Sequence, residues 1–127
     1  NQLNQSIENA RLADGSPADG LNRLVNAYIE NKELVGFIAQ YWYADAQLDA
    51  ELTKAWYLHQ VEVDKFFLRG QAEGIFRIDI TAATFNDGLC WLIVGLVDSE
   101  RRGRVARAGL ADMIQTLFFN GIQHKPL

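Results

Sequence analysis

A chain of 127 residues, 49% of them hydrophobic and 22% charged, has the composition of one globular domain with a single core. Its formal net charge of -4 argues against this segment gripping nucleic acid by itself, because phosphate binding needs a basic face. The single cysteine, Cys90, excludes an intrachain disulfide framework and a zinc site built on several thiolates, which favours a reducing cytoplasm. The longest apolar run, residues 89–97, is about half of what a bilayer-spanning helix needs.

Proline is confined to the two ends of the chain, at Pro17 and Pro126. The roughly one hundred residues between them therefore contain no strong helix breaker. This distribution predicts an all-α fold, and the patterns along the chain divide it into an antiparallel bundle of about six helices.

Two helices are predicted in the N-terminal quarter. The first covers residues 1–13 and ends at Asp14 and Gly15. Ser16 followed by Pro17 is typical of an N-cap with proline at the first helical position. The second helix starts there and has a core-facing stripe at positions i, i+3, i+4, i+7 and i+8. The stripe consists of Leu21, Leu24, Val25, Tyr28 and Ile29.

The middle of the chain contains two more predicted helices. Residues 34–46 combine apolar positions on two sides, which is too broad an arc for a surface helix. Residues 48–73 form the longest predicted helix, roughly 40 Å long at about 1.5 Å per residue. Gly74 is placed to end it.

The last two predicted helices differ in polarity. Thr81 is expected to cap a helix that runs to about Val97, and the apolar run within it must be covered on every side. A chain of this length is expected to cover only part of that run. A charged linker, residues 98–104, then leads to a final helix at residues 105–120.

Two glycines, Gly88 and Gly95, lie seven residues apart and share one face of the first of these helices. Glycine inside a helix costs about 1 kcal/mol relative to alanine. The pair therefore indicates close approach of another backbone, within the chain or from a second copy. Because the final helix also carries apolar residues on more than one face, a two-fold interface between copies is favoured. The expected interface residues are Gly88, Trp91, Gly95, Leu117, Phe118 and Phe119.

Catalytic motifs are scarce. The chain has no glycine-rich phosphate loop, nucleophile elbow or zinc-binding histidine pair. His59 and Glu62 lie one turn apart with Asp64 nearby, which is compatible with two metal ligands or with a base and its orienting group. A pocket-lining or core histidine beside a solvated carboxylate is favoured instead, and Cys90 is expected to be a small buried hydrophobe. We expect no catalytic residue, metal or cofactor.

Aromatic residues gather between positions 28 and 67, on three consecutive predicted helices, with polar residues such as His59 and Gln60 among them. Large rings pack with gaps, and a few polar groups among them are typical of an internal ligand cavity. Plain core packing explains most of these rings equally well. From spacing alone, both interpretations stay open.

One segment of the C-terminal half has a distinctive pattern: a polar helix end, a short turn and two further helices. The residues that carry this pattern are Arg69, Gly70, Gln71, Ala72, Glu73, Gly74, Ile75, Phe76, Arg77, Asp79 and Thr81, and then residues 110–122. The pattern resembles the C-terminal half of tetracycline-repressor (TetR) family transcriptional regulators. In that family, a helix with such an end is followed by a short turn and two helices that form the dimer interface. The family's usual proline after the polar turn is replaced by Ile78.

The resemblance implies that residues 1–127 are an effector-binding and dimerisation domain. Residues 1–14 would then correspond to the helix that connects it to the family's N-terminal helix-turn-helix domain, which is absent from this sequence. A start without methionine fits such a fragment. The implied partners are a second copy, through an intersubunit four-helix bundle of the last two helices, and a small-molecule effector. DNA would be bound only through the missing domain, in the cytoplasm and with no membrane partner.

We therefore expect a ligand-sensing domain of a transcriptional repressor whose effector is small and largely apolar or aromatic. One alternative is a small all-helical enzyme that uses His59. A second alternative is a purely structural dimerisation module with a filled core. The expected ligand-binding residues are Tyr28, Phe37, Tyr41, Trp56, His59, Gln60, Val63, Asn86 and Cys90.

Overall fold

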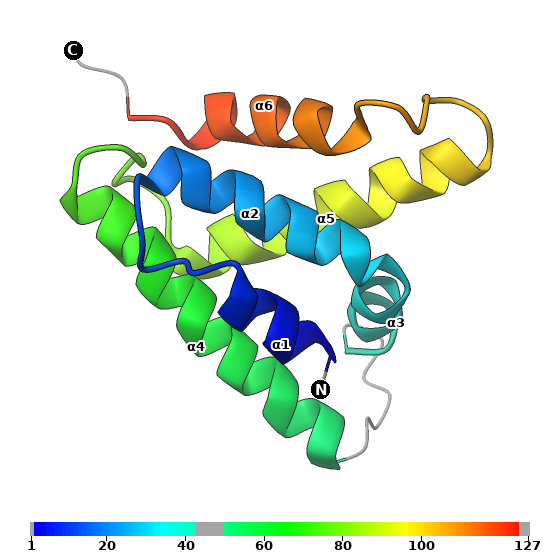
Figure 1. Cartoon of the computed structure of the whole chain (residues 1–127), viewed down its shortest axis with the longest axis horizontal. Coiled ribbons are helices and arrows are strands. Elements are labelled where there is room, and N and C mark those ends of the chain that lie inside the picture. The colour runs from blue at the N-terminus through cyan, green and yellow to red at the C-terminus, as the bar shows by residue number, and fades with distance from the viewer. Residues whose placement is uncertain (1, 43–49, 125–127) are drawn as a thin grey trace.

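The computed structural model describes residues 2–42 and 50–124, and within these ranges it confirms an all-α fold. An isolated antiparallel bridge between Phe76 and Gln123 is the β-type pairing found there. Figure 1 shows the arrangement of the helices. They are α1 (Gln2–Asn9), α2 (Pro17–Glu30), α3 (Lys32–Trp42), α4 (Ala50–Ala72), α5 (Ala82–Arg101) and α6 (Leu110–Ile122).

Helix α2 is the central element and contacts the five other helices. In Figure 1, α6 runs along one side of α2, while α1 and α4 lie on the opposite side. Helix α5 passes behind α2 and packs against α3, α4 and α6. The short helix α1 is thereby held between α2 and α4.

The capping residues predicted from sequence are confirmed. The Ser16 hydroxyl accepts a hydrogen bond of 3.1 Å from the backbone N–H of Asp19, at the start of α2. Thr81 caps α5 in the same way and accepts a bond of 3.1 Å from Thr84. Gly74 has a φ of 76° just beyond α4, a left-handed conformation that glycine adopts without strain.

Helix α1 is shorter than predicted. It ends at Asn9 instead of continuing to position 13, because Arg11 adopts a φ of 50° in the left-handed region. A non-glycine residue rarely occupies that region, so sequence alone did not indicate this turn. The turn brings Leu12 into the buried core of the molecule, where it is 8% exposed.

The connection between α5 and α6 also differs from the prediction. Residues 98–101 were expected to be linker but are helical, and Asp98 and Arg102 form an ion pair of 3.0 Å at i,i+4 spacing. Two left-handed glycines, Gly103 at 73° and Gly109 at 75°, bracket the actual connection. Helix α6 therefore starts later than predicted.

The core contains an aromatic cluster where α4, the turn after it and α5 meet. Phe67 stacks on Phe85 with ring centroids 4.5 Å apart, and Phe76 stacks on Phe67 at 5.5 Å. Phe66 meets Phe76 edge-on, also at 5.5 Å. Full burial of one such ring stabilises the fold by about 1.5–3 kcal/mol.

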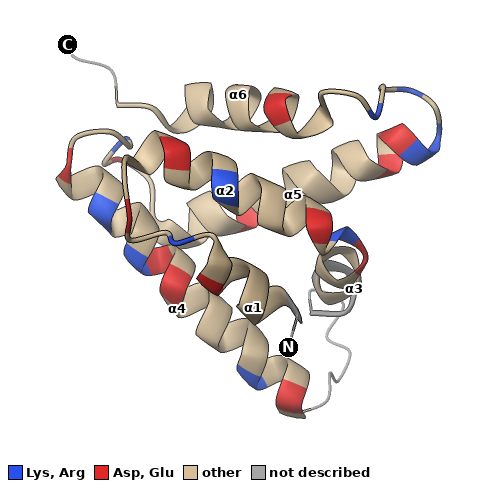
Figure 2. Ribbon diagram, in the orientation of Figure 1, with Lys and Arg blue, Asp and Glu red and all other residues tan. Residues whose placement is uncertain are grey.

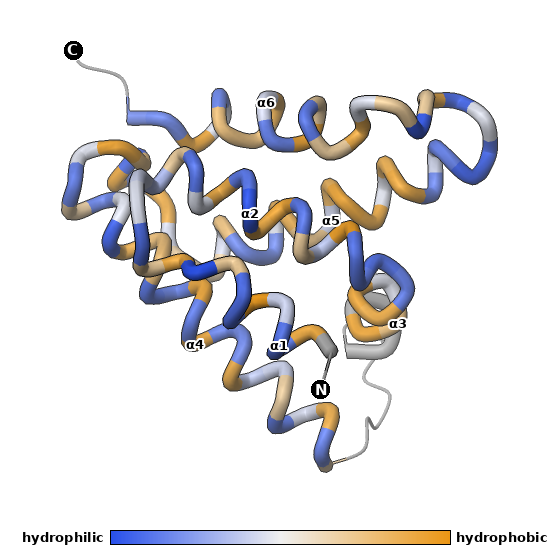
Figure 3. Tube along the Cα trace, viewed as in Figure 1, coloured by the Kyte–Doolittle hydropathy of each residue, from blue (hydrophilic) through white to orange (hydrophobic). Residues whose placement is uncertain are grey.

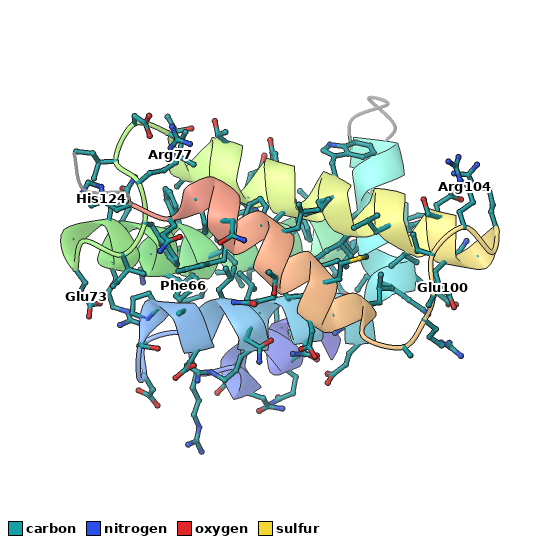
Figure 4. All side chains as sticks on the ribbon, turned by 90° about the horizontal axis from the view of Figure 1, so that it is seen from above. Phe66, Glu73, Arg77, Glu100, Arg104 and His124 are labelled. Atoms are coloured by element: carbon teal, nitrogen blue, oxygen red, sulfur yellow. The ribbon has the colours of Figure 1, made fainter. Side chains whose placement is uncertain are left out.

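The turn that follows α4 is tied to both of its neighbours. A Cβ atom at Gly70 would collide with ring carbons of Phe76, so only glycine lets the ring lie there. The side-chain amide of Gln71 donates to the carbonyl oxygen of Arg77 at 3.0 Å, and the Arg77 N–H donates to Ile122 at 2.6 Å. Figure 4 shows Arg77 beside His124 at this end of the molecule. Most of the segment that resembles the TetR family thus has a packing role here.

One side of α5 is left uncovered by its own chain. Leu89 and Ile93 are buried, whereas Trp91 is 46% exposed and both Gly88 and Gly95 are exposed. Figure 3 shows that the middle of α5 is largely hydrophobic, and Figure 2 shows that α6 carries little charge. This agrees with the expectation that one chain covers only part of the apolar run. In the part of the chain that the structure describes, no helix is both long and apolar enough to cross a bilayer.

Candidate ligand-binding site

A buried polar network joins three helices inside the molecule. Tyr28 comes from α2, His59 from α4 and Asn86 from α5. The Tyr28 hydroxyl oxygen lies 2.6 Å from Nε2 of His59 and 2.7 Å from Oδ1 of Asn86. None of the three residues is more than 2% exposed. Because buried polar groups are costly unless they are paired, these contacts help fix how the three helices pack.

Helical periodicity places these polar groups among apolar ones. Tyr28 belongs to the buried stripe of α2 that the sequence predicted. His59 follows Trp56 by three positions and precedes Val63 by four, so the three share the buried face of α4. The Trp56 and His59 rings meet edge-on with centroids 4.5 Å apart.

Burial keeps these groups uncharged at neutral pH. Desolvation lowers the pKa of His59 from 6.5 to about 4, so its imidazole is neutral. Burial also raises the pKa of Tyr28 well above its ordinary value. It raises the pKa of Cys90 to about 12, so this residue is a thiol and lacks the thiolate that a nucleophile needs.

A cavity of about 410 Å³ lies between α1 and α4 and opens to the surface, where exposed residues such as Glu8, Arg11 and Glu62 form part of its wall. Small-molecule sites typically have volumes of about 300–1,000 Å³. Apolar side chains line it from both sides, with Ile7 and Leu12 on the α1 side and Leu58 on the α4 side. His59 forms part of the wall and so connects the cavity to the polar network.

One ring nitrogen of His59 has no hydrogen-bond partner in the part of the chain that the structure describes. Nε2 meets the Tyr28 hydroxyl, whereas Nδ1 is buried and meets no hydrogen-bond partner among the described residues. A buried polar atom without a partner costs about 1–3 kcal/mol. A bound molecule that forms a hydrogen bond with such an atom removes this cost, which increases its affinity.

Two arginines hold the turn that follows α1. Arg23, from α2, donates to the carbonyl oxygens of Ala10 at 2.6 Å and of Asp14 at 2.7 Å. Arg69, from α4, donates to the carbonyl oxygen of Leu12 at 2.7 Å. The guanidinium groups thereby tie one wall of the cavity to the two helices that flank it.

Most of the residues predicted to bind ligand meet around His59. His59 itself lines the cavity, and Gln60 beside it on α4 is half-buried. Five others are buried on the helix faces that pack behind or beside His59: Tyr28, Trp56, Val63, Asn86 and Cys90.

Phe37 lies elsewhere. It is 43% exposed and lines a separate groove between α3 and α5, together with Trp91 and Gly95. The side chain of Tyr41 lies outside the described part of the structure.

Sequence reasoning missed the α1 side of the cavity. Ile7 and Leu12 meet residues of α4 about fifty positions away, and helical periodicity does not predict which helices meet. Arg11, which also lines the cavity, is marked by its left-handed φ of 50°, a signal visible only in the structure.

Two residues of the enzyme hypothesis, His59 and Glu62, line the same cavity between α1 and α4. Glu62 is exposed and pairs with Lys65 at 3.5 Å, and His59 is buried in the polar network. The pKa of Asp64 is raised by desolvation and by the nearby charge of Asp87. Residues 2–42 and 50–124 contain no group of three His, Cys, Asp or Glu side chains arranged to hold a metal ion.

Most of this chain is similar in sequence to part of a known protein. No family model matches the chain, and no solved structure gives a significant match. The chain is similar to a transcriptional regulator of the HTH type. That relative is the HTH-type transcriptional regulator NfxB of Pseudomonas aeruginosa, which is 39% identical over 120 residues. The match covers 94% of this chain and 64% of the relative, so the chain spans less than two thirds of that protein's length.

Proposed function

We propose that this chain is the ligand-sensing and dimerising part of a TetR-like transcriptional repressor. In this proposal it binds a small, largely apolar or aromatic effector and thereby controls DNA binding by an N-terminal helix-turn-helix domain. The domain acts as a homodimer in the cytoplasm. The similarity to an HTH-type regulator supports the regulatory half of the proposal.

The observation that carries the sensing half is the cavity between α1 and α4, with His59 in its wall. The cavity has the volume of a small-molecule site, its walls combine apolar and polar side chains, and one lining residue, His59, has a buried nitrogen without a partner. A purely structural module has no use for this combination. Filling the cavity and pairing Nδ1 would make such a module more stable.

The position of α1 can couple ligand binding in the cavity to the DNA-binding domain. Helix α1 forms one wall of the cavity and, in the proposed regulator, leads toward the DNA-binding domain. An effector that binds more tightly to one position of α1 shifts the population toward that position, by no more than its difference in affinity. In a two-fold dimer, such a shift changes the spacing of two recognition helices that must lie about 34 Å apart on DNA.

The uncovered side of α5 and α6 supports the dimer. Trp91 is 46% exposed, Met113 41% and Leu117 56%, although all are apolar. Within the chain, a Cβ at Gly95 would have no atom within 4 Å, and one at Gly88 would touch only the ring edge of Phe118. The glycines therefore leave room for another backbone, which we assign to α5 of a second copy.

A two-stage experiment tests this function. Thermal-shift screening of the chain against small apolar and aromatic compounds identifies ligands of the folded state, because such ligands raise stability by mass action. Each ligand is then added to the intact protein bound to a DNA duplex selected from a random pool. We expect at least one ligand to change DNA affinity. Ligands that stabilise the chain but leave DNA affinity unchanged would contradict the proposal, and so would chemical turnover of a ligand.

A further inference from the structure

The unpartnered nitrogen of His59 has a definite hydrogen-bonding character, which follows from its neighbours. Asn86 Oδ1 lies 2.7 Å from the Tyr28 hydroxyl oxygen and 3.8 Å from Sγ of Cys90. A carbonyl oxygen has two lone pairs and no proton, so it accepts from both O–H and S–H. The hydroxyl group of Tyr28 therefore donates its single proton to Oδ1 of Asn86.

This assignment decides the tautomer of His59. Because the Tyr28 proton points to Asn86, its hydroxyl oxygen is an acceptor in the 2.6 Å contact with Nε2. A neutral imidazole carries one N–H, and here it is Nε2 that carries it. Nδ1 is then a bare lone pair: it accepts a hydrogen bond and cannot donate one.

From this geometry we infer that the effector is a molecule with an apolar body and one hydrogen-bond donor, an N–H or O–H group, that binds Nδ1 of His59. The inference rests on the proposed sensing function and names the chemistry of the ligand. A molecule whose polar group only accepts would set two lone pairs against each other at this point. The site thus discriminates by donor character as well as by shape.

Part of the remaining cavity wall fits the apolar body, and the polar side chains of Asn4, Glu8, Arg11 and Glu62 make up the rest of it together with Ala13. Ile7, Leu12 and Leu58 line the cavity, and each offers only hydrocarbon surface. Since Nδ1 has almost no accessible surface, side chains around His59 must move before the donor reaches it. We infer that the moving element is α1, which lines the cavity with α4 and which the proposed regulator uses to reach its DNA-binding domain.

The first arm of the test determines the tautomer without any ligand. The chain contains two histidines, so His124→Gln leaves His59 as the only one. Nitrogen-15 NMR at neutral pH separates a protonated ring nitrogen from a bare one. We expect the proton on Nε2 and a bare Nδ1. A proton on Nδ1 would overturn the inference, because the nitrogen would then require an acceptor.

The second arm compares two probes of nearly equal shape. Indole carries an N–H donor, and benzofuran has an ether oxygen in the same place. We expect indole to bind at least about tenfold more tightly, the contribution of one buried hydrogen bond, and to shift the Nδ1 resonance of His59. Equal affinities, or tighter binding of benzofuran, would overturn the donor requirement.

The outcomes separate this inference from the proposed function. Equal binding of both probes, with shifts at Ile7 and Leu12, removes the donor requirement but keeps a ligand cavity between α1 and α4. If neither probe shifts the resonances of these residues at millimolar concentration, both the donor requirement and the ligand cavity are contradicted. Control of DNA binding is measured independently on the intact protein.

Discussion

The hydroxyl oxygen of Tyr28 lies 2.6 Å from Nε2 of His59, and this contact joins α2 to α4 inside a largely apolar interior. It leaves the second nitrogen of the same ring buried beside the cavity between α1 and α4. One side chain therefore has two roles in this account: Nε2 of His59 helps hold the bundle together, and its buried Nδ1 is the proposed contact of a ligand.

Removing the Tyr28 hydroxyl is expected to destabilise the fold. Tyr28→Phe leaves the N–H of His59 without a partner and removes the O–H donor of Asn86 Oδ1, which costs about 1–3 kcal/mol in the free energy of unfolding. Urea titration followed by circular dichroism measures the change. The matched control is Tyr57→Phe, because Tyr57 is 55% exposed and its substitution should stay within about 0.5 kcal/mol. Equal stability of the two variants would contradict the network.

The depressed pKa of His59 predicts a specific loss of stability in acid. Folding lowers this pKa from 6.5 to about 4, so between these values the unfolded chain binds a proton that the folded chain does not. The stabilising contribution of neutral His59 is complete above about pH 6.5 and is lost as the pH falls, by up to about 1.4 kcal/mol per unit.

His59→Gln isolates this effect because it lacks the titrating group, while the carboxylates of the two proteins are the same. The difference in free energy of unfolding between the two proteins should shrink steadily from neutral pH toward pH 4. A difference that does not change with pH would show that His59 titrates as it does in the unfolded chain.

Gly70 and Gly36 should respond oppositely to alanine. A Cβ at Gly70 meets the Phe76 ring, so Gly70→Ala must displace a buried aromatic side chain and cost about 1–3 kcal/mol. A Cβ at Gly36, inside α3, has no neighbour within 4 Å, so Gly36→Ala should stabilise the protein by about 0.4–1 kcal/mol. Melting temperatures that move in the same direction for both variants would contradict this packing.

The dimer proposal predicts different effects at two equally exposed leucines. Leu117 on α6 and Leu68 on α4 are each 56% exposed. Leu117→Glu places a charge in the proposed interface and should convert a dimer to a monomer, as measured by sedimentation equilibrium. Leu68→Glu should leave the dimer intact. A wild-type monomer at micromolar concentration, or dissociation caused only by Leu68→Glu, would rule out the α5 and α6 interface.

Sequence patterns predicted the helices well because helices depend on interactions between residues that are close in sequence. The stripe of α2 and the caps at Ser16 and Thr81 involve residues within a few positions of one another, where helix geometry dictates contact. The end of α1 was missed because it depends on a left-handed Arg11 held by Arg23, an interaction between separate elements.

The candidate site was only partly predictable for the same reason. Tyr28, His59 and Asn86 were singled out as polar or aromatic residues on buried faces, and the structure brings them together. Phe37 was included as one of the aromatic residues that gather between positions 28 and 67, yet Val35 and Ile38 are the buried ones among the described side chains of α3, and Phe37 lies on the surface. Periodicity identifies a broad apolar helix but does not say which half of it faces inward.

The most direct test of the central claim is to map a bound effector by NMR. An effector obtained by thermal-shift screening is titrated into the chain, and the shifts of backbone and histidine resonances are followed residue by residue. The account predicts that the largest changes occur at Ile7, Leu12 and His59, where α1 meets α4. Largest changes at the separate groove of Phe37 and Trp91, with His59 unaffected, would contradict it.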